Sequence, residues 1–316
     1  MNGFIKRGLL YDIIGDIHGH AKALEALLQK LGYRELGGVW SHPERQVIFL
    51  GDFIDRGPEQ LRAVEIPRRM VEAGHALAVM GNHEFNAVLY ATPDPKDGGY
   101  LREHSEKNRE QHQEFLQAVG EGSALHRELI DWFGSLPVYL DLPALRVVHA
   151  CWHEPSMKAL APWLDNRQRL LPDTWLPAAR KGHEVFSAIE ALLKGLEIAL
   201  PAGVTFRDKG GHHREHARTR WWQDGQPTWQ ETAMVPPEAV EGLPKEQIPP
   251  DQLPGYDGSK PLFLGHYWLT DAVPEPLTKH IACLDYSVAA KKGNGKLVAY
   301  RWEGESVLRA EGFVWV

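Results

Sequence analysis

Three apolar segments near the start of the chain each end in a short motif of glycine and chemically active side chains. The segments LLYDII, QVIFL and HALAVM are followed by the motifs GDIHG, GDFIDRG and GNHE. Leucines 24, 27, 28 and 31 lie on one face of a helix between the first two segments. Strands that alternate with helices predict an α/β fold with a largely parallel sheet, in which all three motifs lie at the carboxyl edge that lines a ligand crevice.

Composition limits the class of protein. With 35 basic and 42 acidic residues the net charge is −7, which argues against non-specific nucleic-acid binding. No run approaches the roughly 18 apolar residues of a membrane span, and Asp12 interrupts the N-terminal apolar stretch, so we expect neither a membrane anchor nor a secretory signal. Two cysteines, Cys151 and Cys283, fit a reducing compartment. We therefore expect a cytoplasmic protein.

The remainder of the chain is expected to complete one domain over residues 1–316. A polar, helical segment at 100–134 is interpreted as part of an insertion at about 91–135, and prolines indicate a loop or lid at about 200–260. Further predicted elements are two short strands within 138–150, helices at 157–170 and 183–194, and C-terminal strands in PLFLG, IACLDYSV, KLVAYRW and VLRAEGFVWV.

The side chains of the three motifs form a coherent set of metal ligands. A single Gly-Asp after a strand is usually a turn in which the aspartate bonds its own backbone. Three such motifs in succession favour a metal site instead. Carboxylate, imidazole and amide oxygen suit Mn²⁺, Fe or Zn²⁺ better than Mg²⁺ or Ca²⁺. Two metals roughly 3.5–4 Å apart need a bridging ligand, and a carboxylate has two oxygens for that purpose.

These motifs, together with VVHAC around His149 and LFLGHYW around His266, resemble the calcineurin-like metallophosphoesterases. Within that superfamily they are similar to the branch that holds phosphoprotein phosphatases and the symmetrical diadenosine tetraphosphate hydrolases of bacteria. The resemblance extends from Asp16 to His266. It implies two mixed β-sheets in a sandwich flanked by helices, and a centre of two divalent metal ions, most often Mn²⁺, with Fe or Zn²⁺ as alternatives.

The resemblance also implies a role for each matching residue. The implied metal ligands are Asp16 and His18 for the first ion, Asp52 as the bridge, and Asn82, His149 and His266 for the second. His83 corresponds to the acid that protonates the leaving group and Asp55 to the residue that orients it. Arg56 corresponds to a phosphate clamp, and Asn82 also faces the phosphate.

A second phosphate-binding arginine is expected from the segment between the last two motifs. The candidates are Arg207, Arg214, Arg218 and Arg220. Arg218 or Arg214 is favoured because the segment is basic and ends in two tryptophans that could anchor it. A charged loop that only faces solvent is the alternative interpretation.

Two positions differ from the usual pattern of the superfamily. Cys151 stands where a glycine usually follows His149-Ala150, and a plain buried cysteine is the favoured interpretation. Trp268 stands where many broader members have a second histidine, Gly-His-x-His. Because tryptophan cannot ligate a metal, this position favours the phosphoprotein phosphatase branch.

The predicted function is metal-dependent hydrolysis of a phosphoester by in-line attack of a metal-bound hydroxide on phosphorus. The expected substrate is a phosphoprotein or a small phosphomonoester, and a symmetrical dinucleoside polyphosphate is the alternative. A more distant alternative is a scaffold that has lost catalysis. The presence of every implied ligand and of His83 argues against it.

Overall fold

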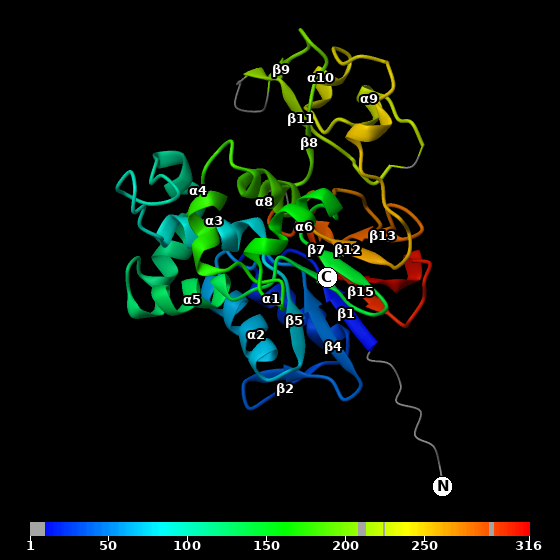
Figure 1. The fold of residues 1–316 in the computed structure, drawn as a ribbon. Helices are drawn as coiled ribbons and strands as arrows, with labels where there is room; N and C mark the ends of the chain where they lie inside the picture. The colour runs from blue at the N-terminus through cyan, green and yellow to red at the C-terminus, as the bar shows by residue number, and fades with distance from the viewer. Residues whose placement is uncertain (1–9, 208–212, 224, 291–293) are drawn as a thin grey trace.

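The computed structural model describes residues 10–207, 213–223, 225–290 and 294–316, and two β-sheets form its centre (Figure 1). In the first sheet the strand order is β14-β15-β1-β4-β5, with β16 beside β15. β1, β4 and β5 are parallel, as predicted, whereas β15 runs antiparallel to β1, so the whole sheet is mixed. The strands are β1 (Leu10–Ile14), β4 (Arg45–Phe49), β5 (Ala76–Ala78), β14 (Asp285–Tyr286), β15 (Lys296–Trp302) and β16 (Phe313–Trp315).

The second sheet has the order β13-β12-β7-β6 and is also mixed. Its strands are β6 (Tyr139–Asp141), β7 (Arg146–Val148), β12 (Leu262–Leu264) and β13 (Ile281–Cys283). Apolar side chains of both sheets form one buried cluster, in which the ring of Phe263 lies 5.2 Å from that of Tyr300. The predicted sandwich of two mixed sheets is therefore confirmed.

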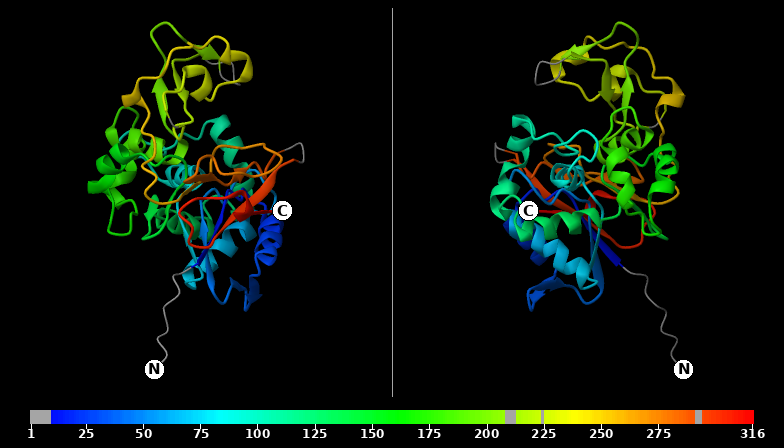
Figure 2. Two further views of the ribbon diagram at one scale, coloured as in Figure 1. Left: turned by 90° about the vertical axis from the view of Figure 1, so that its right-hand side faces the viewer. Right: turned by 60° about the vertical axis from the view of Figure 1, so that its left-hand side comes forward.

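Helices cover the outer faces of this sandwich (Figures 1 and 2). Side chains alternate across a strand, so Ile48 of β4 faces the second sheet while Val47 and Phe49 face the helices. On the side of the first sheet the helices are α1 (Ala21–Lys30), α2 (Gln60–Glu72) and α3 (Asn82–Ala91). On the side of the second they are α6 (Glu154–Leu160) and α8 (Glu184–Lys194). A small hairpin of β2 (Arg34–Leu36) and β3 (Val39–Ser41) follows α1.

The segment predicted as a helical insertion contains two helices, α4 (Glu106–Val119) and α5 (Ala124–Gly134). Gly120, which has a φ of +72°, ends α4, and Ser123 caps α5 by accepting a hydrogen bond from the amide of His126. α5 packs against α3.

One helix prediction is wrong beyond Leu160. The predicted helix at 157–170 ends there, and the chain continues in 3₁₀ helix η1 (Ala161–Trp163), because Pro162 cannot continue the α-helical hydrogen bonding. Leu164 and Leu170 then form a β-bridge. The following turns are η2 (Pro172–Thr174) and α7 (Trp175–Ala178), and a further 3₁₀ turn, η4 (Ala310–Gly312), precedes β16.

The described residues between 197 and 253 form a projection that we call the upper lobe, at the top of Figure 1. Its elements are β8 (Glu197–Ala199), β9 (Phe206–Arg207), β10 (His213–Arg214), β11 (His216–Arg218), α9 (Trp229–Thr232), α10 (Pro237–Val240) and η3 (Pro250–Gln252). The segment predicted as a proline-rich loop or lid thus contains short strands and helices, which surround a separate apolar cluster. Among the described residues no helix is long and apolar enough to cross a membrane.

Candidate metal centre

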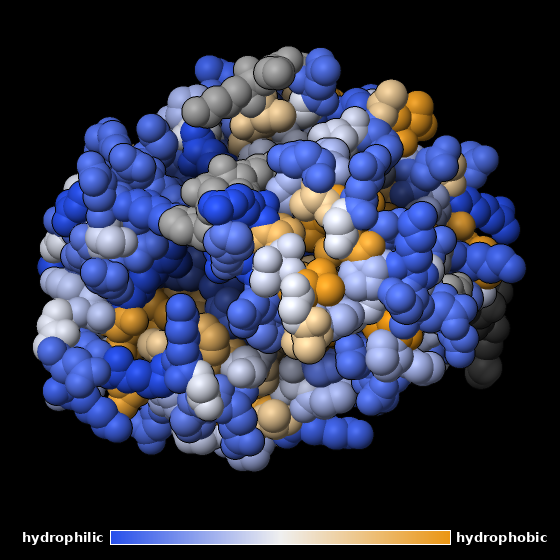
Figure 3. Space-filling view, turned by 90° about the horizontal axis from the view of Figure 1, so that it is seen from above, coloured by the Kyte–Doolittle hydropathy of each residue, from blue (hydrophilic) through white to orange (hydrophobic). Residues whose placement is uncertain are grey.

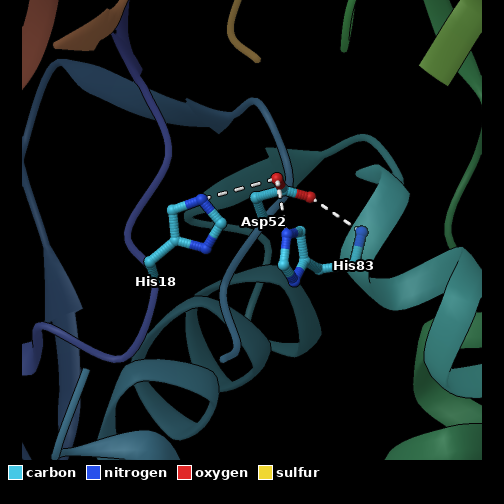
Figure 4. A group of neighbouring side chains, drawn as sticks. All are labelled: His18, Asp52 and His83. Atoms are coloured by element: carbon cyan, nitrogen blue, oxygen red, sulfur yellow. Dashed lines mark hydrogen bonds and ion pairs between the residues drawn. The ribbon is translucent and has the colours of Figure 1, made fainter. Parts of the chain in front are cut away.

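The three motifs meet at the carboxyl ends of β1, β4 and β5, on one side of the first sheet. Backbone hydrogen bonds join the first two loops: the amides of His18 and Gly19 donate to the carbonyls of Asp52 and Phe53 at 2.9 and 2.8 Å. Figure 4 shows His18 and His83 on either side of Asp52. The parallel strands therefore bring together side chains that are far apart in the sequence.

Asp52 lies at the centre of the cluster. Its Oδ2 atom is 3.6 Å from Nε2 of His18 and 3.4 Å from Nε2 of His149, while Oδ1 accepts a hydrogen bond from the amide of His83. Two groups of potential metal ligands within the described residues share this carboxylate, His18–Asp52–His83 and Asp52–His149–His266. One aspartate thus lies between two clusters of ligand atoms.

The second sheet supplies His149 after β7 and His266 after β12. Oδ1 of Asn82 lies 3.2 Å from Nε2 of His149 and 2.7 Å from Nδ1 of His266. Nδ1 of His149 donates to the carbonyl of Leu50 at 2.7 Å, so Nε2 is the nitrogen that is directed at Asn82 and Asp52. These three predicted ligands therefore converge beside Asp52.

Two buried atoms of the first cluster lack a hydrogen-bond partner among the described residues. They are Oδ1 of Asp16 and Nε2 of His18. The other oxygen of Asp16 accepts from the amide of His266, and Nδ1 of His18 bonds the carbonyl of Ile54. Leaving buried polar atoms unpaired is unfavourable, because they have lost their hydrogen bonds to water. An oxygen and an imidazole nitrogen left without a partner in this way are suited to bind a divalent cation.

Burial keeps two of the imidazoles neutral, as metal ligation requires. It lowers the pKa of His18 to about 3, and it also holds the pKa of His266 well below its ordinary value, with the nearby charge of Arg218 as a further cause. His149 differs, because the carboxylate of Asp52 outweighs burial and raises the pKa of His149 to about 10.

His83 and Asp55 form a hydrogen-bonded pair at the edge of the centre. Nδ1 of His83 lies 2.5 Å from Oδ2 of Asp55, and a guanidinium nitrogen of Arg56 lies 3.5 Å from Nε2 of the same imidazole. Burial lowers the pKa of His83, but Asp52 and Asp55 outweigh it and raise the pKa overall. The other oxygen of Asp55 bonds His112 of α4, a contact that the sequence does not reveal.

Arg56 stacks on Trp268, a contact that the sequence does not reveal either. The guanidinium carbon lies 3.9 Å from the centroid of the tryptophan ring, and 37% of Trp268 is exposed. The amide of Trp268 donates to the buried carboxylate of Asp285 at 2.9 Å. An aromatic face beside a guanidinium restricts its position. The residue at the place of a superfamily histidine thus contacts the predicted phosphate clamp.

Left-handed backbone conformations concentrate in these loops. Eight described residues other than glycine have a positive φ, and six of them belong to the cluster: His18, Asp52, Asp55, Arg56, His266 and Trp268. Such conformations are unfavourable by about 1–3 kcal/mol each and occur where surrounding structure enforces them. The backbone itself therefore marks this region as functional, independently of its side chains.

Glu84, the last residue of GNHE, ties the loops together. It is fully buried and accepts hydrogen bonds from the amides of Asp52 and Phe53, both at 2.8 Å, and from Gly81 at 3.1 Å. Burial and the charge of Asp52 raise the pKa of Glu84 to about 7. No role is predicted for Glu84 from the sequence, although its position in the GNHE motif could have indicated one.

The structure distinguishes the two favoured arginines. Arg218 lies on β11 and is half-buried, and its charge contributes, after burial, to the lowered pKa of His266. Its Nε is buried without a partner among the described residues, and its nearest carboxylate, that of Glu197, lies 3.6 Å away. Arg214 is exposed on β10. Of the other candidates, Arg207 is exposed on β9, and Arg220 donates to the carbonyl of Glu231.

Both cysteines are buried free thiols. Burial raises the pKa of Cys151 and of Cys283 well above the ordinary value, so both stay protonated at neutral pH. Neither has the lowered pKa of a nucleophilic cysteine.

A separate cavity of about 800 Å³ lies where the upper lobe meets residues 277–281. It is lined by Trp222, Gln223, Gln226, Pro227, Glu231, Tyr256, Gly258, Leu277, Thr278, Lys279, His280 and Ile281. None of the predicted site residues lines it. Seen from above, the molecule is largely hydrophilic, with apolar side chains gathered in a few patches (Figure 3).

A family model described as calcineurin-like phosphoesterase matches residues 10–244, most of the chain. The chain belongs to this family. The predicted family is thereby confirmed. Calcineurin-like phosphoesterases hydrolyse phosphoester bonds, and this is the enzyme class that the sequence predicts. The matched residues include every motif of the cluster except the one around His266.

Several curated relatives share a short region with the chain. The chain is 42% identical over 73 residues to the bis(5'-nucleosyl)-tetraphosphatase PrpE [asymmetrical] of Oceanobacillus iheyensis. The alignment covers 23% of the chain and 29% of that protein. The Bacillus subtilis protein of the same name is 43% identical over 88 residues, 28% of the chain and 36% of that protein. The alignments thus span about a third of the length of these relatives.

A solved structure has the same fold over nearly the whole chain. A protein serine/threonine phosphatase from Saccharomyces cerevisiae superposes with a TM-score of 0.50 at 14% sequence identity, covering 98% of the chain and 80% of that structure. At this identity the likeness supports the fold alone.

Proposed function

We propose that this protein hydrolyses phosphomonoesters, on a protein or on a small molecule, with a centre of two divalent metal ions. The observation that carries the proposal is the position of Asp52, whose carboxylate lies within 4 Å of an imidazole from each of two ligand clusters. A carboxylate between two such clusters is suited to bridge two cations.

Six side chains would hold the ions. The first ion would be bound by Asp16, His18 and the bridging Asp52, and the second by Asp52, Asn82, His149 and His266. The unpaired atoms of Asp16 and His18 and the mixed oxygen and nitrogen donors support this assignment. We propose Mn²⁺ as the native metal, with Fe or Zn²⁺ as alternatives. When bound, such a pair of ions acidifies water and neutralises charge on phosphoryl oxygens.

Side chains around the ions would bind the phosphoryl group and direct the proton. Arg56, stacked on Trp268, and Arg218, whose charge acts on His266, provide guanidinium groups for phosphoryl oxygens, and Asn82 would also face the phosphate. His83 donates the proton that the leaving oxygen needs. Asp55 orients His83 and stabilises its protonated form, as a general acid near neutral pH requires.

A dinucleoside polyphosphate is the second candidate substrate. The observation that favours it is the name that the curated relatives carry, bis(5'-nucleosyl)-tetraphosphatase [asymmetrical]. That name specifies the asymmetrical reaction, whereas the resemblance of the sequence motifs suggests the symmetrical one. The two are distinguished by their products, because symmetrical cleavage of diadenosine tetraphosphate yields only diphosphate and asymmetrical cleavage yields triphosphate and monophosphate.

A substrate panel tests the proposal. The purified protein is assayed with Mn²⁺, Fe²⁺ or Zn²⁺ on para-nitrophenyl phosphate, a phosphoserine peptide and diadenosine tetraphosphate, with nucleotide products separated by chromatography. We expect turnover of the monoesters to require metal and to be highest with Mn²⁺. Exclusive turnover of diadenosine tetraphosphate would favour the second candidate, and no turnover of any substrate in metal-loaded protein would contradict the proposal.

A further inference from the structure

A hydrogen bond of His112 links α4 to the candidate metal centre. This residue lies on α4, within the insertion at 91–135, and is 57 positions from Asp55 in the sequence. Its Nδ1 atom is 2.7 Å from Oδ1 of Asp55, whose other oxygen bonds His83. The side chain of His112 is buried, as is that of Asp55. One carboxylate thus joins two imidazoles, one from the core of the fold and one from the insertion.

Packing holds His112 in this position. Its ring lies 5.0 Å from that of Phe115 on the same helix and 5.5 Å from that of Tyr90. Tyr90 belongs to α3, the helix whose first turn carries His83. The insertion and the helix of the acid are therefore packed together around the hydrogen-bonded carboxylate.

We propose that His112 is a positioning residue for proton donation, and this proposal rests on the proposed role of His83 as the acid. Nδ1–H of His112 donates to Oδ1 of Asp55 and fixes the plane of the carboxylate. Oδ2 is then directed at Nδ1–H of His83, so Nε2 of His83 points toward the substrate. A hydrogen bond within a buried network restricts its partners more strongly than one in water. The insertion would thereby supply the hydrogen bond that fixes Asp55 and, through Asp55, the proton donor His83.

Two amide substitutions provide a matched test. The amide nitrogen of asparagine can occupy the place of Nδ1 of histidine, so His112→Asn retains the donor to Asp55. The amide of His112→Gln reaches the place of Nε2 instead and removes that donor. We expect His112→Gln to slow phenyl phosphate hydrolysis roughly 10-fold, a fraction of the about 10²–10⁴-fold that a general acid contributes. His112→Asn should retain most of the parent rate.

Three comparisons keep this test specific to positioning. Para-nitrophenolate leaves readily without a proton, so kcat for para-nitrophenyl phosphate should hardly change in His112→Gln. His126→Gln, a change to a buried histidine of α5, should leave the preference between substrates unaltered. In Asp55→Asn protein, addition of His112→Gln should cause no further loss, because residues that act through one carboxylate are not additive. Metal content and melting temperature are measured for every variant.

The outcomes separate this inference from the proposed function. Equal loss on both substrates in His112→Gln, the same loss in His112→Asn, or a loss that adds to that of Asp55→Asn would overturn the positioning role. If His83→Asn fails to distinguish the two substrates, the acid assignment itself is wrong. If His83→Asn distinguishes them and His112→Gln does not, only the role of His112 is refuted.

Discussion

The loops around Asp52 and the upper lobe are built in different ways. The loops are joined by backbone hydrogen bonds and by Glu84, and they leave little free space: a Cβ atom at Gly265 would lie 2.1 Å from Oδ1 of Asp16. The lobe has two-stranded sheets and helices of four residues around its own apolar cluster. The loops are therefore held closely together, whereas most of the lobe packs around its own cluster and contacts the centre through Trp221, whose Nε1 donates to the hydroxyl of Tyr267 at 2.9 Å. We propose that the first region carries the chemistry and that the second contributes one phosphate contact, Arg218.

The largest effect is expected from Asp52→Asn. An amide has one good ligating oxygen and no charge, so it cannot bridge two cations and balance them. We expect loss of detectable turnover and a fall in bound metal, measured by elemental analysis of the purified variant. Near-normal turnover with two bound ions would show that the loops do not form a bridged centre.

His83→Asn should cause the next largest loss, and only for substrates with a poor leaving group. We expect turnover of a phosphoserine peptide to fall by about 10²–10⁴-fold and that of para-nitrophenyl phosphate to fall far less, because only the serine alkoxide needs a proton. The measurement is kcat on both substrates with metal content as the control. Loss of metal from this variant would instead identify His83 as a ligand, which its closeness to Asp52 allows.

Arg218→Ala tests the phosphate contact that we propose for the upper lobe. A hydrogen bond to a charged group is worth about 1.5–3 kcal/mol, so kcat/KM should fall roughly 10- to 100-fold while both metals stay bound. Arg214→Ala, a change to an exposed arginine of the same lobe, is the matched control and should have little effect. If Arg214→Ala is the more damaging substitution, the two arginines have been assigned in the wrong order.

Trp229→Ala should have the smallest effect on chemistry. Trp229 is buried in the cluster of the upper lobe, and loss of a core tryptophan usually lowers the free energy of unfolding by about 3–5 kcal/mol. We expect faster amide hydrogen exchange within 197–253, unchanged exchange in β1 and β4, and full metal content. Activity should fall no further than in Arg218→Ala. Release of metal would contradict the independence of the two regions.

The sequence predicted the centre of the molecule well because local pattern and tertiary structure agree there. Apolar strands followed directly by glycine motifs led to β1, β4 and β5 in their correct parallel arrangement. The carboxyl ends of parallel strands lie together by geometry, so the order of strands and motifs along the chain is enough to predict that Asp16, Asp52 and Asn82 converge.

Contacts between distant segments could not be predicted in the same way. His112 lies in a polar helix, and nothing in its surrounding sequence indicates that it faces Asp55. The antiparallel addition of β15 beside β1 and the stacking of Arg56 on Trp268 likewise depend on how remote elements pack. In the upper lobe, strands of two or three residues are too short to show a periodicity.

The position of β15 has a consequence for biosynthesis. Asp12 on β1 and Arg301 on β15 form a hydrogen bond although they are 289 residues apart. At roughly 5–20 residues per second, a ribosome needs about 15–60 s to synthesise the intervening chain. During this time the edge of β1 that later pairs with β15 has no partner strand, and such edges are prone to pair with other chains. Production of this protein in cells should therefore gain from chaperones that shield nascent chains.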